Sequence, residues 1–168
     1  MTALNVVVLA AGQGKRMYSN LPKVLHKLAG KPMLQHLMDS ANALNPSKMC
    51  IVYGHGGETV RNAFADCAAV WAKQEPQLGT GHAVLQAVPH LDNDGLTLIL
   101  YGDVPLTRSD SLKQLTDVAQ SGKLAVLTIE LNDPTGYGRI VRDSKGNITG
   151  IVEHKDATPE QRKIREVN

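Results

Sequence analysis

The sequence predicts an α/β fold in which a Rossmann-like, mostly parallel sheet carries helices on both faces, making three layers. The chain has 168 residues, enough for one domain whose core needs no disulfide or metal to stabilise it. Short apolar runs rich in β-branched residues recur along the chain, and such runs are typical of strands buried on both faces. Stretches with helical spacing separate these runs over the first two thirds of the sequence. Since strands that alternate with helices form parallel sheets, we expect residues 1–168 to form one such domain.

The first predicted elements are a strand and a long helix. The run from Val6 to Leu9 predicts a strand over Asn5–Ala11, which Gly12 ends. Pro32 suits the first position of a helix, and Pro46 stops that helix. The residues between the two prolines follow helical spacing and form one apolar stripe, made of Met33, Leu34, Leu37, Met38, Ala41 and Leu44.

Two further strands and two further helices follow in the middle of the chain. Met49–Tyr53 is a second apolar run, and the turn after it leads into a short helix that includes Val60, Ala63 and Phe64. Ala69–Lys73 predicts a third strand, and Gly79–Val88 predicts a helix entered through a Gly-Thr-Gly loop.

The next predicted element is a strand over Leu96–Tyr101, which we expect to be buried. A helix over Ser109–Gln120 has Leu112, Leu115 and Val118 on one side, and Gly122 follows its end. Leu124–Leu131 predicts a fifth strand. Two short strands, Arg139–Val141 and Ile148–Val152, flank a polar turn that contains glycine and predict a hairpin. The final residues, Glu166 to Asn168, resemble the entry to another strand.

Charge and cysteine content exclude several classes of protein. Lys and Arg number 18 and Asp and Glu number 16, a net charge of +2, which argues against a dedicated nucleic-acid binder but allows a local phosphate pocket. Cys50 and Cys67 lie far apart, so we expect buried apolar side chains and neither structural zinc nor a disulfide framework. No apolar run approaches the ~18 residues of a membrane span, and the first residues lack the basic start of a signal peptide. We therefore expect a cytoplasmic protein that does not bind or span a membrane.

The loop after the first strand has the residue types of a phosphate-binding turn. In open α/β sheets, ligands bind at the carboxyl ends of the strands. Leu9-Ala-Ala-Gly-Gln-Gly-Lys-Arg-Met17 follows the first strand, and its small residues let the backbone approach a ligand while Lys15 and Arg16 add positive charge. The spacing fits neither a dinucleotide fingerprint nor a Walker loop. A tight turn with surface charges is the alternative.

The next two loops contain a constrained lysine and an amide. Pro22 fixes the backbone before Lys23, which can act as a point charge for phosphate or lie as a solvated surface lysine. Gln74 ends the third strand, and its amide has both the donor and the acceptor that a uracil edge requires. Gly79-Thr80-Gly81 before a helix offers N–H groups and a hydroxyl, although it also reads as an ordinary helix start. His82 has no second histidine at ligand spacing, so we assign it no metal.

An acidic residue ends the fourth strand. Asp103 lies in Tyr101-Gly102-Asp103-Val104-Pro105, and one carboxylate is enough to begin a nucleotide-metal site because phosphates and water complete the Mg²⁺ octahedron. A helix N-cap is the alternative role for an acid here, but Ser109 and Asp110 suit it better. We therefore favour a metal ligand.

The hairpin region adds two weaker candidates. The glycines of Gly136-Tyr137-Gly138-Arg139 leave room for a sugar ring, and Glu153 can accept hydrogen bonds from its hydroxyls. Taken alone, we favour a turn and a solvated acid as their roles.

Together these motifs resemble the uridylyltransferase domain of the bacterial N-acetylglucosamine-1-phosphate uridylyltransferases, which belong to the nucleotide-diphospho-sugar transferase fold. The resemblance covers essentially all 168 residues in order. The first loop marks nucleotidyltransferases broadly. The motifs that narrow it to this family are Pro22-Lys-Val-Leu25, Gln74-x4-Gly-Thr-Gly-His-Ala83, Tyr101-Gly-Asp-x-Pro-Leu106 and Gly136-Tyr-Gly-Arg-Ile140.

The resemblance implies a reaction in which UTP and N-acetylglucosamine-1-phosphate give UDP-N-acetylglucosamine and pyrophosphate, for peptidoglycan and lipopolysaccharide precursors. It implies Arg16, Lys23 and Asp103 as catalytic residues, with Asp103 as the Mg²⁺ ligand. The implied substrate-binding residues are Leu9, Ala10, Ala11, Gly12, Gly14, Lys23, Gln74, Gly79, Thr80, Tyr101, Gly102, Gly138, Glu153 and Asn168.

The resemblance also implies that the domain is incomplete at its C-terminal end. In the family, a second metal-binding asparagine lies beyond Asn168, as does a β-helix domain that acetylates glucosamine-1-phosphate with acetyl-CoA and forms a homotrimer. We therefore expect the 168-residue chain to be impaired in catalysis and stability, and Asn168 to lie near Asp103 and Gly138. Two other functions stay open: another sugar-nucleotide pyrophosphorylase, and a non-catalytic sugar-nucleotide binding module.

Overall fold

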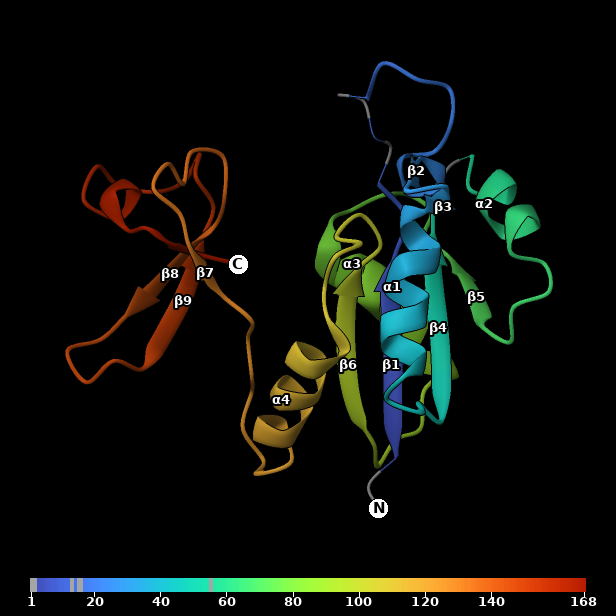
Figure 1. The fold of residues 1–168 in the computed structure, drawn as a ribbon. Helices are drawn as coiled ribbons and strands as arrows, with labels where there is room; N and C mark the ends of the chain where they lie inside the picture. The colour runs from blue at the N-terminus through green and yellow to red at the C-terminus, as the bar shows by residue number, and fades with distance from the viewer. Residues whose placement is uncertain (1–2, 13, 15–16, 55) are drawn as a thin grey trace. The chain divides into compact units, whose positions relative to one another are not determined.

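The computed structural model describes residues 3–12, 14, 17–54 and 56–168. These form two compact units, an N-terminal unit up to Ser121 and a C-terminal unit from Gly122 (Figure 1). The elements of the N-terminal unit are β1 (Leu4–Leu9), η2 (Lys23–Leu25), β2 (Lys27–Leu28), β3 (Lys31–Pro32), α1 (Met33–Asn42), β4 (Lys48–Tyr53), α2 (Glu58–Ala63), β5 (Val70–Lys73), α3 (Thr80–Ala87), η3 (Val88–His90), β6 (Leu96–Tyr101) and α4 (Ser109–Ala119). Those of the C-terminal unit are β7 (Ile129–Glu130), β8 (Arg139–Arg142), β9 (Ile148–Val152), η4 (Gln161–Lys163) and β10 (Glu166–Val167).

The N-terminal unit contains the predicted parallel sheet, in the order β5-β4-β1-β6. The central strand β1 pairs with β4 on one side and β6 on the other, so that Val6 lies opposite both Met49 and Leu98. All the pairings in this sheet are parallel, as the alternation of strands and helices predicted. Since parallel strands end at the same edge, the loops after β1, β5 and β6 leave the sheet on one side.

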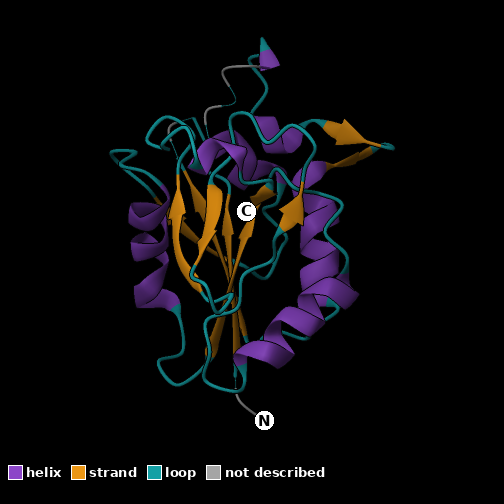
Figure 2. Ribbon diagram, turned by 90° about the vertical axis from the view of Figure 1, so that its left-hand side faces the viewer, coloured by secondary structure: helices purple, strands orange, loops and turns teal. Residues whose placement is uncertain are grey.

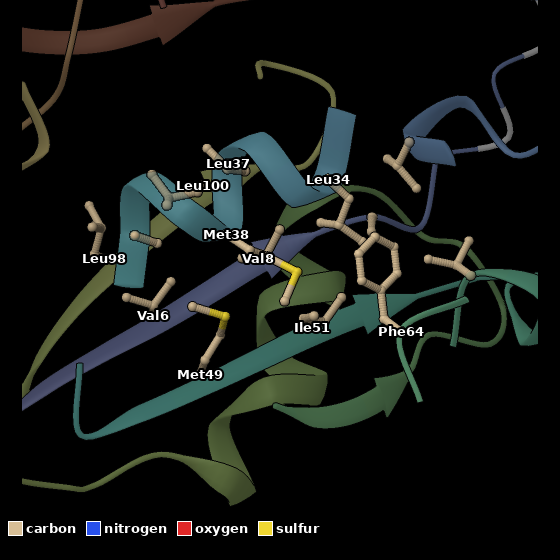
Figure 3. Packing of buried hydrophobic residues seen from close by; sticks show 14 of the residues in the cluster. Val6, Val8, Leu34, Leu37, Met38, Met49, Ile51, Phe64, Leu98 and Leu100 are labelled. Carbon is tan, nitrogen blue, oxygen red and sulfur yellow. The ribbon is translucent and has the colours of Figure 1, made fainter. Parts of the chain in front are cut away.

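Helices cover both faces of this sheet, which confirms the three-layer prediction (Figure 2). Because side chains alternate along a strand, Val6 and Val8 face α1 while Val7 faces α3. On the first face Leu34, Leu37 and Met38 of α1 pack on the strands (Figure 3). Val60 of α2 and Leu112 of α4 belong to the same apolar cluster. On the second face only small residues of α3, Ala83 and Ala87, meet the sheet. The continuous apolar run of β1 is therefore buried on both sides.

Three details of the N-terminal unit differ from the predictions. β6 is half-buried, with Ile99 and Tyr101 42% and 45% exposed, because it is an edge strand with a neighbour on one side only. Arg108 stands at the N-cap of α4, and no side chain caps that helix. Val118 is 54% exposed, so only Leu112 and Leu115 of the predicted stripe reach the core.

The C-terminal unit is a small antiparallel sheet in the order β7-β10-β8-β9. The hairpin of β8 and β9 forms as predicted. The strand predicted over Leu124–Leu131 shrinks to Ile129–Glu130, because only these two residues pair in register with residues of β10, and Leu124 is 94% exposed. β10 forms where the final residues predicted a strand, and it pairs with β7 and with β8.

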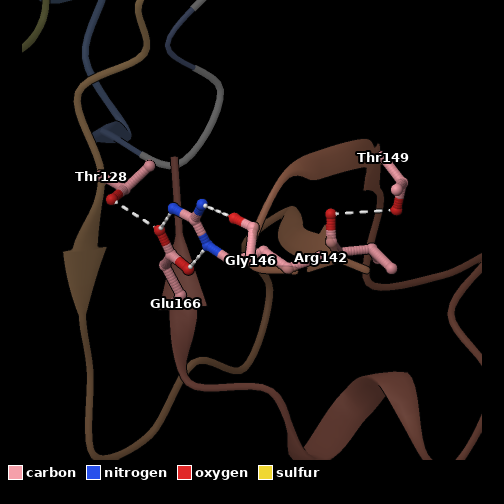
Figure 4. A network of polar contacts seen from close by, with 6 residues as sticks. Thr128, Arg142, Gly146, Thr149 and Glu166 are labelled. Carbon is pink, nitrogen blue, oxygen red and sulfur yellow. Dashed lines mark hydrogen bonds and ion pairs between the residues drawn. The ribbon is translucent and has the colours of Figure 1, made fainter. Parts of the chain in front are cut away.

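A carboxylate at the start of β10 ties three segments of this unit together (Figure 4). Arg142 donates to both carboxylate oxygens of Glu166, over 2.6 and 2.7 Å, and Thr128 Oγ1 donates to Oε1 over 2.8 Å. The hydrogen bonds from Arg142 are the main cause that lowers the pKa of Glu166 from 4.5 to about 2. Arg142 also donates to the carbonyl of Gly146, in the turn of the hairpin.

Glu166→Gln should therefore destabilise the chain in a way that depends on pH. Because the folded-state pKa lies below the ordinary value, the ionised carboxylate stabilises the fold above pH 4.5, and this contribution is lost as the pH falls toward 2. The half-exposed Arg142 keeps the effect to about 1 kcal/mol at neutral pH. Thermal unfolding followed by circular dichroism should show a lower Tm for the variant at neutral pH and no difference near pH 2. Glu160→Gln, at an exposed acid, is the control, and an equal loss at both pH values would contradict the role of the charge.

Candidate functional site

A cavity of about 340 Å³ opens at the carboxyl ends of the parallel strands in the N-terminal unit. It lies where the loops after β1, β5 and β6 meet, as expected for an open α/β sheet. Most of the predicted substrate-binding residues of this unit line it: Leu9, Ala10, Ala11, Gly12, Lys23, Gln74, Gly79, Thr80 and Tyr101, together with Asp103. The structure thus brings into one cavity residues that are spread over most of the unit's sequence.

A lysine and an aspartate form an ion pair at this cavity. Lys23 begins η2 after Pro22, and Asp103 follows the end of β6. The distance from Lys23 Nζ to Asp103 Oδ2 is 2.7 Å, and both side chains are about one third exposed, at 34% and 38%. Asp103 Oδ1 has no hydrogen-bond partner among the residues that the structure describes. The site therefore presents an ammonium and a carboxylate that are both still reachable from the cavity.

Two of the predicted glycines support this pair by packing and do not line the cavity. A Cβ at Gly14 would lie 2.9 Å from Lys23 Cβ, and the φ of Gly14 is +59°, so both space and backbone favour glycine there. Gly102 donates its N–H to the carbonyl of Leu9 over 2.9 Å. A Cβ at Gly102 would lie 3.2 Å from that carbonyl and 3.3 Å from Val24. Because glycine has no Cβ, the loop after β6 can lie close to the end of β1.

The other end of the cavity is built around a buried amide. Gln74 is 4% exposed, and its backbone N–H donates to the carbonyl of Tyr53 over 2.8 Å. Its side-chain Nε2 donates to the carbonyl of Gly79 over 3.0 Å and lies 3.2 Å from His82 Nδ1. Gly79 stands at the N-cap of α3 with φ 97° and ψ −179°, a conformation open almost only to glycine. This backbone turns the Gly79 carbonyl toward Gln74 and so fixes the amide.

Sequence reasoning missed two residues of this site. Gln77 lines the cavity and donates through Nε2 to the carbonyl of Ala11. A Cβ at Gly54 would lie 2.0 Å from that Nε2 and 2.7 Å from the same carbonyl, so the contact needs a glycine there. Nothing in the sequence separates Gln77 from other polar loop residues, because the contact joins loops that are distant along the chain.

The remaining candidates lie in the C-terminal unit or outside the described residues. A Cβ at Gly138 would lie 2.7 Å from Asn168 Oδ1 and 3.7 Å from Glu153 Oε1, so these three predicted sugar-binding residues gather at one place in that unit. Arg16, predicted to bind phosphate, and Lys15 beside it lie outside the described residues.

Other features bear on metals and membranes. The described part of the chain has no cluster of three or more His, Cys, Asp or Glu side chains that could hold a metal. Cys50 and Cys67 are free thiols, and burial raises the pKa of Cys50 to about 11, as suits an inert apolar side chain.

Within the described ranges, every helix is too short or too polar to cross a bilayer.

Comparison with known proteins gives the family. Residues 6–149 match the MobA-like NTP transferase domain. The chain belongs to the MobA-like NTP transferase family. It is therefore a nucleotidyltransferase domain.

Curated relatives are similar over the whole chain. It is 60% identical over 169 residues to the bifunctional protein GlmU of Nitrosospira multiformis and 62% identical over 165 residues to that of Herminiimonas arsenicoxydans. These matches cover 100% and 98% of this chain but only 37% and 36% of the relatives, in their N-terminal part. The chain thus spans little more than a third of the length of these relatives.

Solved structures share the fold. A UDP-glucose pyrophosphorylase complexed with UDP-glucose superimposes with a TM-score of 0.78 over 98% of this chain and 73% of its own, at 20% identity. Rv0371c of Mycobacterium tuberculosis, in a complex with manganese, has a TM-score of 0.61 over 71% of this chain and 61% of its own, at 21% identity. These structures confirm the nucleotide-diphospho-sugar transferase fold.

Proposed function

We propose that this chain is the uridylyltransferase part of a bifunctional enzyme and that it joins UTP to N-acetylglucosamine-1-phosphate, releasing pyrophosphate. The observation that carries the proposal is the cavity that has the buried Gln74 amide at one end and the Lys23–Asp103 pair at the other. An amide suits a base edge, while an ammonium and a carboxylate suit a triphosphate with its metal. The whole-length similarity to proteins named bifunctional GlmU supports the choice of reaction.

The proposed reaction depends on positioning the two substrates and on neutralising the charge of the phosphates, and it needs no general base. The attacking sugar-phosphate oxygen is already an anion, so it can attack the α-phosphorus in line while pyrophosphate leaves. Lys23 can neutralise charge on the phosphates, because its ammonium has three N–H donors and the contact with Asp103 uses one of them. Arg16 is proposed to assist Lys23, and no Ser, Cys or His acts as a nucleophile.

The residues at the cavity fit a magnesium ion. Asp103 is a hard oxygen ligand that remains partly exposed, and the free Oδ1 can face a cation while Lys23 holds Oδ2. A magnesium ion bound there would neutralise the developing negative charge on the phosphates. The manganese complex of Rv0371c supports a divalent ion in this fold. Asp103 would hold the ion, and the phosphates and water would supply its other ligands.

The amino sugar is proposed to contact Gly138, Glu153 and Asn168 of the C-terminal unit. Gly138 leaves space next to the Asn168 amide and the Glu153 carboxylate, both of which can hydrogen-bond to hydroxyls. We also propose that the parent protein is cytoplasmic, acetylates glucosamine-1-phosphate with acetyl-CoA in another domain and forms a homotrimer. The relatives' greater length and the word bifunctional in their names support a second activity outside this chain.

Release of pyrophosphate from UTP and N-acetylglucosamine-1-phosphate tests the proposal. It should be measured on this chain and on an extended chain, in which these residues replace the matching part of the Nitrosospira multiformis relative. The extended chain should turn over UTP with this sugar phosphate in preference to glucose-1-phosphate. A preference for glucose-1-phosphate would indicate another sugar-nucleotide pyrophosphorylase, and nucleotide binding without turnover would indicate a binding module.

Gln74→Ala should weaken UTP binding about tenfold and reduce the preference for UTP over CTP, since one buried hydrogen bond to the base is lost. Calorimetric titration of both nucleotides into the chain measures the two dissociation constants. Gln114→Ala, at an exposed amide on α4, is the matched control and should bind like the wild type. An unchanged preference for UTP in Gln74→Ala would contradict the role of this amide.

A further inference from the structure

The hydrogen bonds of Gln74 leave one polar atom of its side chain for a ligand. The Gly79 carbonyl can only accept, so the Gln74 atom that faces it over 3.0 Å must be the donor Nε2. The second N–H of this Nε2 points to His82 Nδ1, 3.2 Å away. Both donors of the amide are then used within the protein. Gln74 Oε1 has no hydrogen-bond partner among the described residues and belongs to a side chain that lines the cavity.

This arrangement requires one protonation state of His82. A neutral imidazole has one N–H and one lone pair, so its Nδ1 can accept from Gln74 only if the proton is on Nε2. Gln86 Nε2 lies 3.2 Å from His82 Nε2 and donates to the His82 carbonyl over 3.1 Å. Two amide nitrogens cannot both donate to the ring. Gln74 is fixed by burial and by the Gly79 carbonyl, whereas Gln86 is less buried. Gln86 is therefore the side chain that gives up its hydrogen bond to the His82 carbonyl and turns its oxygen to the ring.

We propose that His82 is a positioning residue for base selection, whose Nδ1 holds the Gln74 amide so that only an acceptor, Oε1, faces the nucleotide. This inference rests on the proposed function. An acceptor matches the N3–H of uracil and opposes the N3 lone pair of cytosine. Without His82 the second N–H of Gln74 is free to turn toward the cavity, where it can donate to cytosine. The preference for UTP therefore depends on a histidine in the first turn of α3 that need not touch the base.

Matched substitutions separate this role from simple packing. The Oδ1 of asparagine and the Nδ1 of histidine are both bonded to Cγ, so His82→Asn can place an acceptor where Nδ1 lies. In His82→Gln the acceptor is one bond farther from the backbone, and His82→Ala has none. Titration of the full 168-residue chain with UTP and with CTP should show about a tenfold loss of preference for UTP in His82→Ala and His82→Gln. His82→Asn should keep the preference, as should the control His90→Ala, at the exposed histidine of η3.

A second measurement does not depend on any variant. Nitrogen-15 NMR of the wild-type histidines should show an unprotonated Nδ1 and a protonated Nε2 for His82. A proton on Nδ1 would overturn the proposal, and so would an unchanged preference for UTP in His82→Ala while Gln74→Ala loses it. In both cases the proposed function would stand. A wild-type chain that does not prefer UTP would instead overturn the proposed function, and this inference with it.

Discussion

Asp103→Asn should lower turnover of the extended chain by about a hundredfold or more, because a fixed carboxylate next to the phosphates is replaced by a neutral amide that binds a hard cation poorly. The substitution keeps the shape of the side chain, and the side chain is 38% exposed, so the fold should survive. The loss should be greatest at low magnesium and partly recovered as magnesium is raised. Pyrophosphate release as a function of magnesium concentration measures both effects.

The chain contains a matched control for this substitution. Asp39 on α1 pairs with Lys31 over 2.6 Å, with side chains 46% and 45% exposed, and neither residue lines the cavity. Asp39→Asn therefore removes a similar carboxylate from a similar ion pair away from the site and should leave turnover unchanged. Near-wild-type turnover of Asp103→Asn at low magnesium would show that Asp103 is not the metal ligand.

The sequence predicted the parallel sheet because the relevant signal is local. Val6, Val7 and Val8 are buried on alternate faces, and a continuous apolar run reports this without any knowledge of the neighbours. The same signal failed at Leu124, where apolar residues are present but none of the strands that the structure describes pairs with them. It also overstated the burial of Ile99, because a run of apolar residues does not say whether its strand lies at the edge of the sheet.

The sequence allowed us to predict which residues lie at the candidate site, but not which of them contact one another. Lys23 and Asp103 each follow a recognisable signal, a proline that fixes the backbone and the end of a strand. The 2.7 Å contact between Lys23 Nζ and Asp103 Oδ2 could not be predicted from the sequence, because it depends on the pairing of β1 with β6 and on the space that Gly14 leaves. Gln77 contacts the Ala11 carbonyl and His82 contacts the Gln74 amide, and no residue type or spacing in the sequence indicates either contact.

Lys23→Ala should lower kcat of the extended chain by about a hundredfold, because a positive charge aimed at the transferring phosphates is lost. The change in Tm should be small, since the ion pair with Asp103 is partly exposed and such pairs add little stability. Lys23→Met keeps the stem of the side chain next to Gly14 and removes only the ammonium, so it should lose as much activity as Lys23→Ala.

The comparison with Lys31→Ala decides whether Lys23 acts on the reaction or on the fold. Lys31 forms the equivalent pair with Asp39 on the surface, so its removal costs a similar ion pair without touching the cavity. If Lys23 acts on the phosphates, the two alanine variants should unfold at similar temperatures and differ about a hundredfold in kcat. Wild-type kinetics in Lys23→Ala together with a lower Tm would mean that the Lys23–Asp103 pair only stabilises the loops. A rise in KM for UTP with kcat unchanged would mean that Lys23 binds the ground state and the transition state equally well.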